Sequence, residues 1–183
     1  MRAFLGIELD PEWRDMLTAL GASIREQDSA WREAKWVAPQ NLHVTLQFLG
    51  EIDSVTAEEI PVQLVKELSH TEPFDLPLDE AVYAVPSPAR AKMLWTTLLD
   101  SRGKGSGLVK LIEQVALTCG IEADAREYRP HITLARVRKP KRFDLTPHIT
   151  TPPAVSVQHV TLYKSTLTRQ GPVYEILARV PLG

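Results

Sequence analysis

The sequence is poor in the features that mark secreted and membrane proteins. Its 183 residues include a single cysteine, Cys119, so no disulfide can form within the chain, as is usual in a reducing compartment. No apolar run is long enough to cross a membrane. The amino-terminal stretch MRAFLGIELDPEW carries acidic residues too early for a secretory signal. We therefore expect a soluble, cytoplasmic protein with no membrane partner.

An excess of positive charge is also missing. The chain has 21 Lys and Arg residues against 23 Asp and Glu residues, a formal net charge of −2. This balance excludes a generally basic coat for nucleic acid. Positive charge is concentrated in one local cluster: Arg126, Arg129, Arg138, Lys139, Lys141 and Arg142. Two interpretations of the cluster stay open, a local patch that attracts nucleic acid and a solvated loop.

Hydrophobic periodicity predicts a mixture of strands and helices. Alternating apolar residues indicate half-buried strands over 2–9 and 42–48. Apolar residues at helical spacing from Trp13 to Ile24, after Asp10-Pro11, indicate a helix between them. Along the whole chain the predicted order is β-α-β-β-α-β-β-α-β-β-β, which favours the α+β class. A strand, a helix and a strand that begins with histidine occur in both halves, so we expect two similar lobes.

Three of the five histidines open nearly the same tetrapeptide. HVTL occurs at 43–46 and again at 159–162, and HITL occurs at 131–134. In a strand, residues i and i+2 share a face, so His43 and Thr45 point one way while Val44 faces the core. Each copy therefore presents an imidazole and a hydroxyl on one face of a strand, which a β-branched Val or Ile on the other face anchors to the core.

Two such units that face each other have the groups needed for displacement at phosphorus. One imidazole can take a proton while the other gives one, because histidine titrates near neutral pH. The two hydroxyls can bind phosphate oxygens. A zinc site is the competing interpretation, but Cys119 lies far from these strands and no carboxylate sits at a short offset within them. Strand composition alone also favours Thr, Val and Ile, and spacing does not say which copies act.

With its flanks, the sequence resembles the 2H phosphoesterase superfamily, whose hallmark is two H-x-T/S motifs. It is most similar to the bacterial and archaeal RNA 2′,3′-cyclic phosphodiesterases, once called 2′-5′ RNA ligases. The resemblance covers nearly the whole chain. The stretches that carry it are MRAFLGIEL, WVAPQNLHVTLQFLGE, RPHITLAR and LYKSTLTRQGPVYEI.

The resemblance implies one α+β domain over residues 1–183. It is bilobal, with two pseudo-two-fold-related lobes of mostly antiparallel sheet, helices outside and an active-site cleft between. The implied reaction hydrolyses a 2′,3′-cyclic phosphate to a 2′-phosphate, with His43 as proton donor, His131 as proton acceptor, and Thr45 and Thr133 on the phosphate. No metal or cofactor is implied. The expected partner is RNA with a cyclic phosphate end, or a cyclic nucleotide, bound by a monomer. The alternatives are 2′-5′ RNA ligation by the reverse chemistry and a non-catalytic RNA-end binding module.

The resemblance also assigns Arg136 to the phosphate and Phe48 to the nucleobase. Each lies five positions after its motif histidine, and strict alternation would place it on the opposite face. A bulge or a strong twist after the leucine would remove the conflict. The family uses no histidine at the third copy, so we interpret His159 as a look-alike, and we expect His70 and His148 at the surface.

Overall fold

The computed structural model describes residues 1–122, 127–147, 149, 154–169 and 171–183. His148 and Arg126, for which the sequence predicted a surface position and a place in the basic cluster, lie outside the described residues. The strands are β1 (Arg2–Glu8), β2 (Lys35–Trp36), β3 (His43–Glu51), β4 (Phe74–Leu76), β5 (Leu78–Val85), β6 (Ala91–Leu98), β7 (His131–Lys141), β8 (Val155–Val157), β9 (His159–Leu167) and β10 (Pro172–Pro181). The helices are α1 (Pro11–Gln27), α2 (Ser29–Arg32), α3 (Ser54–Leu68) and α4 (Lys104–Thr118), with 3₁₀ turns η1 (Pro39–Asn41) and η2 (Pro88–Arg90).

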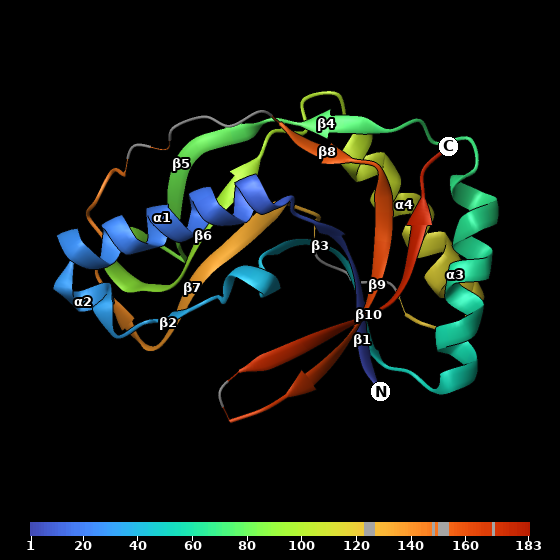
Figure 1. Ribbon diagram of the computed structural model, residues 1–183, viewed down its shortest axis with the longest axis horizontal. Helices are drawn as coiled ribbons and strands as arrows, with labels where there is room; N and C mark the ends of the chain where they lie inside the picture. The colour runs from blue at the N-terminus through green and yellow to red at the C-terminus, as the bar shows by residue number, and fades with distance from the viewer. Residues whose placement is uncertain (123–126, 148, 150–153, 170) are drawn as a thin grey trace.

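Within the described residues, one antiparallel sheet runs through the whole molecule in the order β10-β9-β1-β3-β7-β6-β5, and β2 pairs with β7. Strands β4 and β8 form a separate pair. The sheet divides into two lobes (Figure 1). Helices α3 and α4 cover the lobe of β1, β3, β9 and β10, and α1 and α2 lie beside the lobe of β2, β5, β6 and β7. This arrangement confirms the predicted bilobal α+β fold.

The two lobes exchange helices. Helix α1 follows β1 but packs on the other lobe, where Gly21 lies against the Trp36 ring of β2. Helix α4 follows β6 but packs against β3 and α3. The units β1-α1-β3 and β6-α4-β7 thus follow the same course, and each leading strand lies beside its histidine strand. The duplication predicted from the sequence is present as a pseudo-two-fold relation.

The two histidine strands meet at the centre of the sheet. Val44 of β3 lies directly opposite Ile132 of β7, and both side chains are fully buried. Leu46 and Leu134, two residues further along each strand, are also buried. Burial of these apolar side chains fixes which face of each strand meets the core, because side chains alternate along a strand.

No helix in the part of the chain that the structure describes is long and apolar enough to span a bilayer.

Candidate active site

The central strand pair brings the two motifs together. Continuing the antiparallel register from Val44 and Ile132 places His43 beside Thr133 and Thr45 beside His131. All four side chains lie on the face opposite the buried Val44–Ile132 pair, and all are partly exposed. The local two-fold relation exchanges the two histidines and the two threonines. A small group placed over this pair of strands is therefore flanked by an imidazole on either side.

Both imidazoles are held in the same way. The Nδ1 atom of His43 lies 2.7 Å from the Asn41 carbonyl oxygen, and the Nδ1 atom of His131 lies 2.8 Å from the Arg129 carbonyl oxygen. A carbonyl oxygen can only accept, so Nδ1 carries a hydrogen in both rings. The free lone pair of each neutral ring is then on Nε2, and an imidazolium presents Nε2–H. Each Nε2 can serve as base or acid.

The His43 ring lies in an aromatic pocket. Its Nε2 atom is 3.0 Å from Thr45 Oγ1. The Phe4 ring of β1 lies at a centroid distance of 4.9 Å, and the Tyr174 ring of β10 stands edge-on at 5.3 Å. The His131 ring contacts Trp95 of β6 at 4.2 Å. These rings, two beside His43 and one beside His131, restrict the imidazoles to defined orientations.

A bulge occurs in each histidine strand at the leucine of the tetrapeptide. Gly6 pairs with Thr45 but Leu5 pairs with Gln47, which leaves Leu46 as the extra residue of β3. In the same way, Leu134 is the extra residue of β7, because its neighbours Thr133 and Ala135 pair with Trp95 and Leu94. Each bulge shifts the alternation by one residue, so the fifth residue after each histidine lies on the same face as that histidine.

Phe48 and Arg136 consequently lie on the histidine face, as the predicted bulge required. Phe48 pairs with Phe4, whose ring contacts His43, and it is 51% exposed. Arg136 pairs with Met93, two residues from Trp95 on β6, and its guanidinium contacts the Met93 sulfur. The structure thus brings both residues to the candidate site, and their roles in binding stay predictions.

Burial and positive charge make both histidines less basic. Desolvation lowers the pKa of His43 below its usual value of 6.5, and the nearby charges of His131 and Arg136 lower it further, against the Asn41 carbonyl, which raises it. Desolvation also lowers the pKa of His131, and Arg136 adds to this effect against the Arg129 carbonyl. Arg136 therefore acts electrostatically on both rings. Near neutral pH the resting site favours two neutral imidazoles with a cation beside them.

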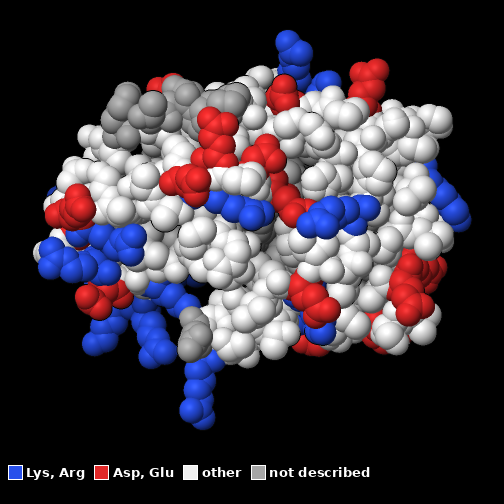
Figure 2. All heavy atoms as spheres, in the orientation of Figure 1, with Lys and Arg blue, Asp and Glu red and all other residues white. Residues whose placement is uncertain are grey.

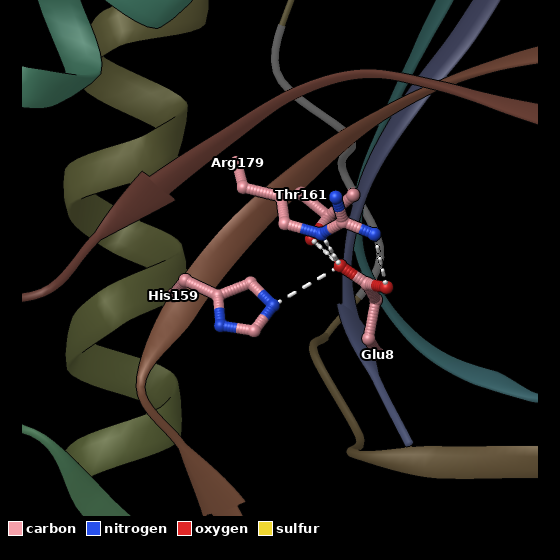
Figure 3. Close-up of polar contacts among 4 residues, drawn as sticks. All are labelled: Glu8, His159, Thr161 and Arg179. Atoms are coloured by element: carbon pink, nitrogen blue, oxygen red, sulfur yellow. Dashed lines mark hydrogen bonds and ion pairs between the residues drawn. The ribbon is translucent and has the colours of Figure 1, made fainter. Parts of the chain in front are cut away.

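The third tetrapeptide has different surroundings. His159 Nε2 lies 3.1 Å from Glu8 Oε1, and Thr161 donates a hydrogen bond of 2.8 Å to the same oxygen (Figure 3). Arg179 binds both carboxylate oxygens of Glu8. Thr161 is fully buried, whereas Thr45 and Thr133 are partly exposed. His159 of β9 thus belongs to an ion cluster around Glu8, and β1 separates it from His43 of β3. His70 is exposed after α3.

Two hollows in the described part of the chain are lined by neither His43 nor His131. One, of about 250 Å³, lies between the start of α1 and the Glu8 cluster. The other, of about 210 Å³, lies between α1 and the segment that follows Trp36. Of the two motifs, only Leu134 lines one of these hollows, and the histidines and threonines lie outside both. Among the described residues, no three His, Cys, Asp or Glu side chains are grouped as metal ligands.

The basic cluster is partly neutralised. Arg129 forms an ion pair with Glu127 and Arg142 with Asp144, at 3.0 and 2.5 Å. Arg138 and Lys139 of β7 are exposed. Figure 2 shows Lys and Arg side chains gathered at the lower left, below α2 and β2. Only part of the cluster is therefore available to an RNA strand.

Sequence reasoning missed the residues that other strands bring to the histidines. Phe4, Trp95 and Tyr174 contact an imidazole, and although Phe4 and Tyr174 lie in stretches that carry the family resemblance, nothing in the sequence pairs them with a histidine. Gly6 lies under the His43 ring: a Cβ there would be 2.8 Å from the Val44 carbonyl oxygen and 3.6 Å from His43 Cδ2. A glycine inside an alternating strand was the available signal, because it marks a close backbone approach.

Two imidazoles on one sheet face, each with a hydroxyl two residues further on, match the arrangement that the sequence predicted for a two-histidine phosphoesterase site. The model of the LigT like Phosphoesterase family matches residues 7–95 and 101–174. The match covers most of the chain, so the protein belongs to this phosphoesterase family, and the resemblance found in the sequence is confirmed.

Relatives and solved structures agree with this assignment. The RNA 2′,3′-cyclic phosphodiesterase of Escherichia coli K12 is 31% identical over 175 residues, covering 87% of this chain and 90% of the relative. That of Methanothermobacter thermautotrophicus is 27% identical over 180 residues, covering 95% of each chain. The structure of E. coli LigT complexed with 3′-AMP has a TM-score of 0.82 and 25% identity, covering 99% of this chain and 97% of the other.

Proposed function

We propose that this protein is an RNA 2′,3′-cyclic phosphodiesterase that opens a terminal 2′,3′-cyclic phosphate to a 2′-phosphate. The observation that carries the proposal is the matched pair of imidazoles, each held through Nδ1 by a carbonyl oxygen 2.7 or 2.8 Å away. Relatives across archaea and bacteria bear the name of this activity. Both motifs come from one chain and one continuous sheet, which supports a single domain acting as a monomer.

In the proposed reaction, His131 is the base and His43 is the acid. The Nε2 atom of neutral His131 takes a proton from water as the water oxygen attacks phosphorus. The bond from phosphorus to the 3′ oxygen breaks, and Nε2–H of protonated His43 gives its proton to that oxygen. The phosphate stays on the 2′ oxygen. Attacking and leaving oxygens lie on opposite sides of phosphorus in an in-line displacement, which fits imidazoles on opposite sides of the group.

The remaining site residues hold the phosphate and the base in this proposal. Thr45 and Thr133 donate hydrogen bonds to the non-bridging oxygens, and Arg136 supplies the positive charge that the phosphorane requires. Phe48 offers an exposed ring on which the terminal base can stack. The chemistry assigned to these residues needs proton transfer and charge stabilisation, so we propose no metal and no cofactor in the reaction.

The assay is hydrolysis of an oligoribonucleotide that ends in a 2′,3′-cyclic phosphate, in buffer containing EDTA. The expected product is the 2′-phosphate. A 3′-phosphate would mean that the leaving oxygen is wrongly assigned. Binding without turnover would instead identify an RNA-end binding module. Supplying an RNA 5′-hydroxyl end in excess tests ligation, since a 2′-5′ bond would form by the reverse displacement.

A further inference from the structure

The Glu8 cluster lies on the same face of the sheet as His43. Glu8 of β1 pairs with His43 of β3. On its other side, the pairing of Gly6 with Thr161 continues to Glu8 and His159, and the bond between these two side chains agrees with this register. The three residues thus form a row across three neighbouring strands. Two strand spacings place the backbones of His43 and His159 about 10 Å apart.

The Glu8 carboxylate is saturated by its neighbours (Figure 3). It accepts hydrogen bonds from Arg179 at 2.6 and 3.0 Å and from Thr161 at 2.8 Å, and His159 Nε2 lies 3.1 Å away. The hydrogen bonds from Arg179 lower the pKa of Glu8 from 4.5 to about 2, against the effect of burial. Glu8 therefore stays ionised and holds Arg179 and His159 in place. Its own charge is largely cancelled.

A polar hollow of about 250 Å³ adjoins this cluster. Arg14 of α1, His159 and Arg179 all line it. The Arg14 Nε atom is buried and has no hydrogen-bond partner among the described residues. A buried donor without a hydrogen bond lowers the stability of the folded protein, and a bound ligand with an acceptor oxygen would form the missing bond. Figure 3 also shows the second ring nitrogen of His159 facing away from Glu8.

Two acidic and two basic side chains line the hollow, so its formal charge is balanced, and the way in which these charges are paired is what favours an anion. Glu8 is paired with Arg179, and no carboxylate in the described part of the chain forms an ion pair with Arg14. Asp10, the other acid at the hollow, is exposed at the start of α1, where water screens its charge. The guanidinium of Arg14 and, in its imidazolium form, the ring of His159 offer N–H donors to this hollow, and these match the acceptor oxygens of a phosphate.

We propose that this hollow binds an internal phosphodiester of the RNA substrate, two or three nucleotides before the cyclic end. The inference rests on the proposed function for the position of that end. Successive phosphates of one strand advance about 3.4 Å when stacked and further when extended. The row from His43 to His159 is therefore covered within two or three nucleotides. The third histidine tetrapeptide then helps to select substrates by their length, because His159 lines the site of an internal phosphate. The protein is expected to bind oligonucleotides more tightly than cyclic mononucleotides.

Binding of reaction products tests this inference without depending on turnover. Dissociation constants are measured by calorimetry, at fixed salt, for a mononucleotide and a tetranucleotide that each end in a 2′-phosphate. The tetranucleotide is expected to bind about tenfold more tightly, the size of one charge-assisted phosphate contact. In Arg14→Gln and His159→Gln this ratio falls to about two or less. A tetranucleotide with uncharged methylphosphonate linkages binds like the mononucleotide.

The matched control is Arg102→Gln, which removes an exposed arginine before α4 and keeps the ratio. A parent ratio near one overturns the inference. So does a ratio that persists in Arg14→Gln, or tight binding of the uncharged tetranucleotide. If Arg102→Gln loses the ratio as fully as Arg14→Gln does, the preference for the tetranucleotide depends on the total positive charge of the protein, and the inference is overturned. If the parent binds with the expected ratio but does not hydrolyse the cyclic phosphate, the proposed function fails and the phosphate site stands.

Discussion

Gly6 offers a test of how the backbone of β1 positions His43 and His131, the proposed catalytic pair. A Cβ atom at this position would lie 2.8 Å from the carbonyl oxygen of Val44, 3.5 Å from Tyr163 Cε2 and 3.6 Å from His43 Cδ2. The first distance is too short for carbon and oxygen, so β1 and β3 must move apart. Val44 is also the residue that pairs with Ile132 of the other lobe. Gly6→Ala is therefore expected to displace His43 relative to His131.

The expected sizes follow from packing and geometry. Overpacking of this kind costs about 1–3 kcal/mol in the free energy of unfolding. A displacement of the imidazole by a fraction of an ångström to about 1 Å lowers kcat by about tenfold to hundredfold. Both are measured on purified protein, by denaturant unfolding and by turnover of a cyclic-ended oligonucleotide well below the unfolding transition.

Gly107→Ala is the matched control. A Cβ atom at Gly107 meets nothing within 4 Å, and the residue lies inside α4. This variant is expected to gain about 0.5–1 kcal/mol in stability, because alanine favours a helix over glycine, and to keep its kcat. A folded Gly6→Ala protein with the parent kcat would refute the reasoning, since the imidazole would then tolerate the altered strand spacing.

Three further predictions concern pH and binding. The profile of kcat/KM against pH should be bell-shaped with both pKa values below 6.5, because burial and Arg136 disfavour the two imidazolium ions. Arg136→Gln should shift this profile to higher pH. A profile that is unchanged in Arg136→Gln would exclude the electrostatic role of Arg136. Glu8→Gln should destabilise the fold by about 1–2 kcal/mol near pH 7 after allowance for solvent screening. Since the pKa of Glu8 is lowered from 4.5 to about 2, the difference from the parent should shrink as pH falls through that window, as denaturant unfolding would show. Phe48→Ala should raise KM by about tenfold, because stacking of the terminal base on the ring is lost. Tm should stay within a few degrees of the parent value, because the ring is 51% exposed. An unchanged KM would mean that the base binds elsewhere.

The sequence predicted well what local patterns determine. The alternation in HVTL and HITL placed His43 and His131 opposite the core, and Val44 and Ile132 are indeed fully buried. The five-residue offset of Arg136 required an irregular strand, and the structure has a bulge at Leu134. The position differs slightly from the prediction, since the extra residue is the leucine itself rather than one after it.

What the sequence could not show depends on register between distant strands. Tyr174 reaches His43 only because β10 and β9 extend the lobe past β1. Glu8 and His159 bond although 151 positions separate them. Side-chain periodicity says which face a residue takes but not which strand lies beside it. The family resemblance alone makes the third tetrapeptide a look-alike, and only the folded chain shows that His159 lies beside Glu8.

The central claim is that His43 and His131, rather than the other histidines, carry the chemistry. The direct measurement is kcat/KM for a 2′,3′-cyclic mononucleotide in His43→Ala, His131→Ala, His159→Gln and the exposed control His70→Ala. We predict losses of about 10²–10⁴-fold in the first two, a far smaller loss in His159→Gln, and the parent rate in His70→Ala. A loss in His159→Gln as large as that in His131→Ala, or near-parent rates in His43→Ala or His131→Ala, would contradict the claim.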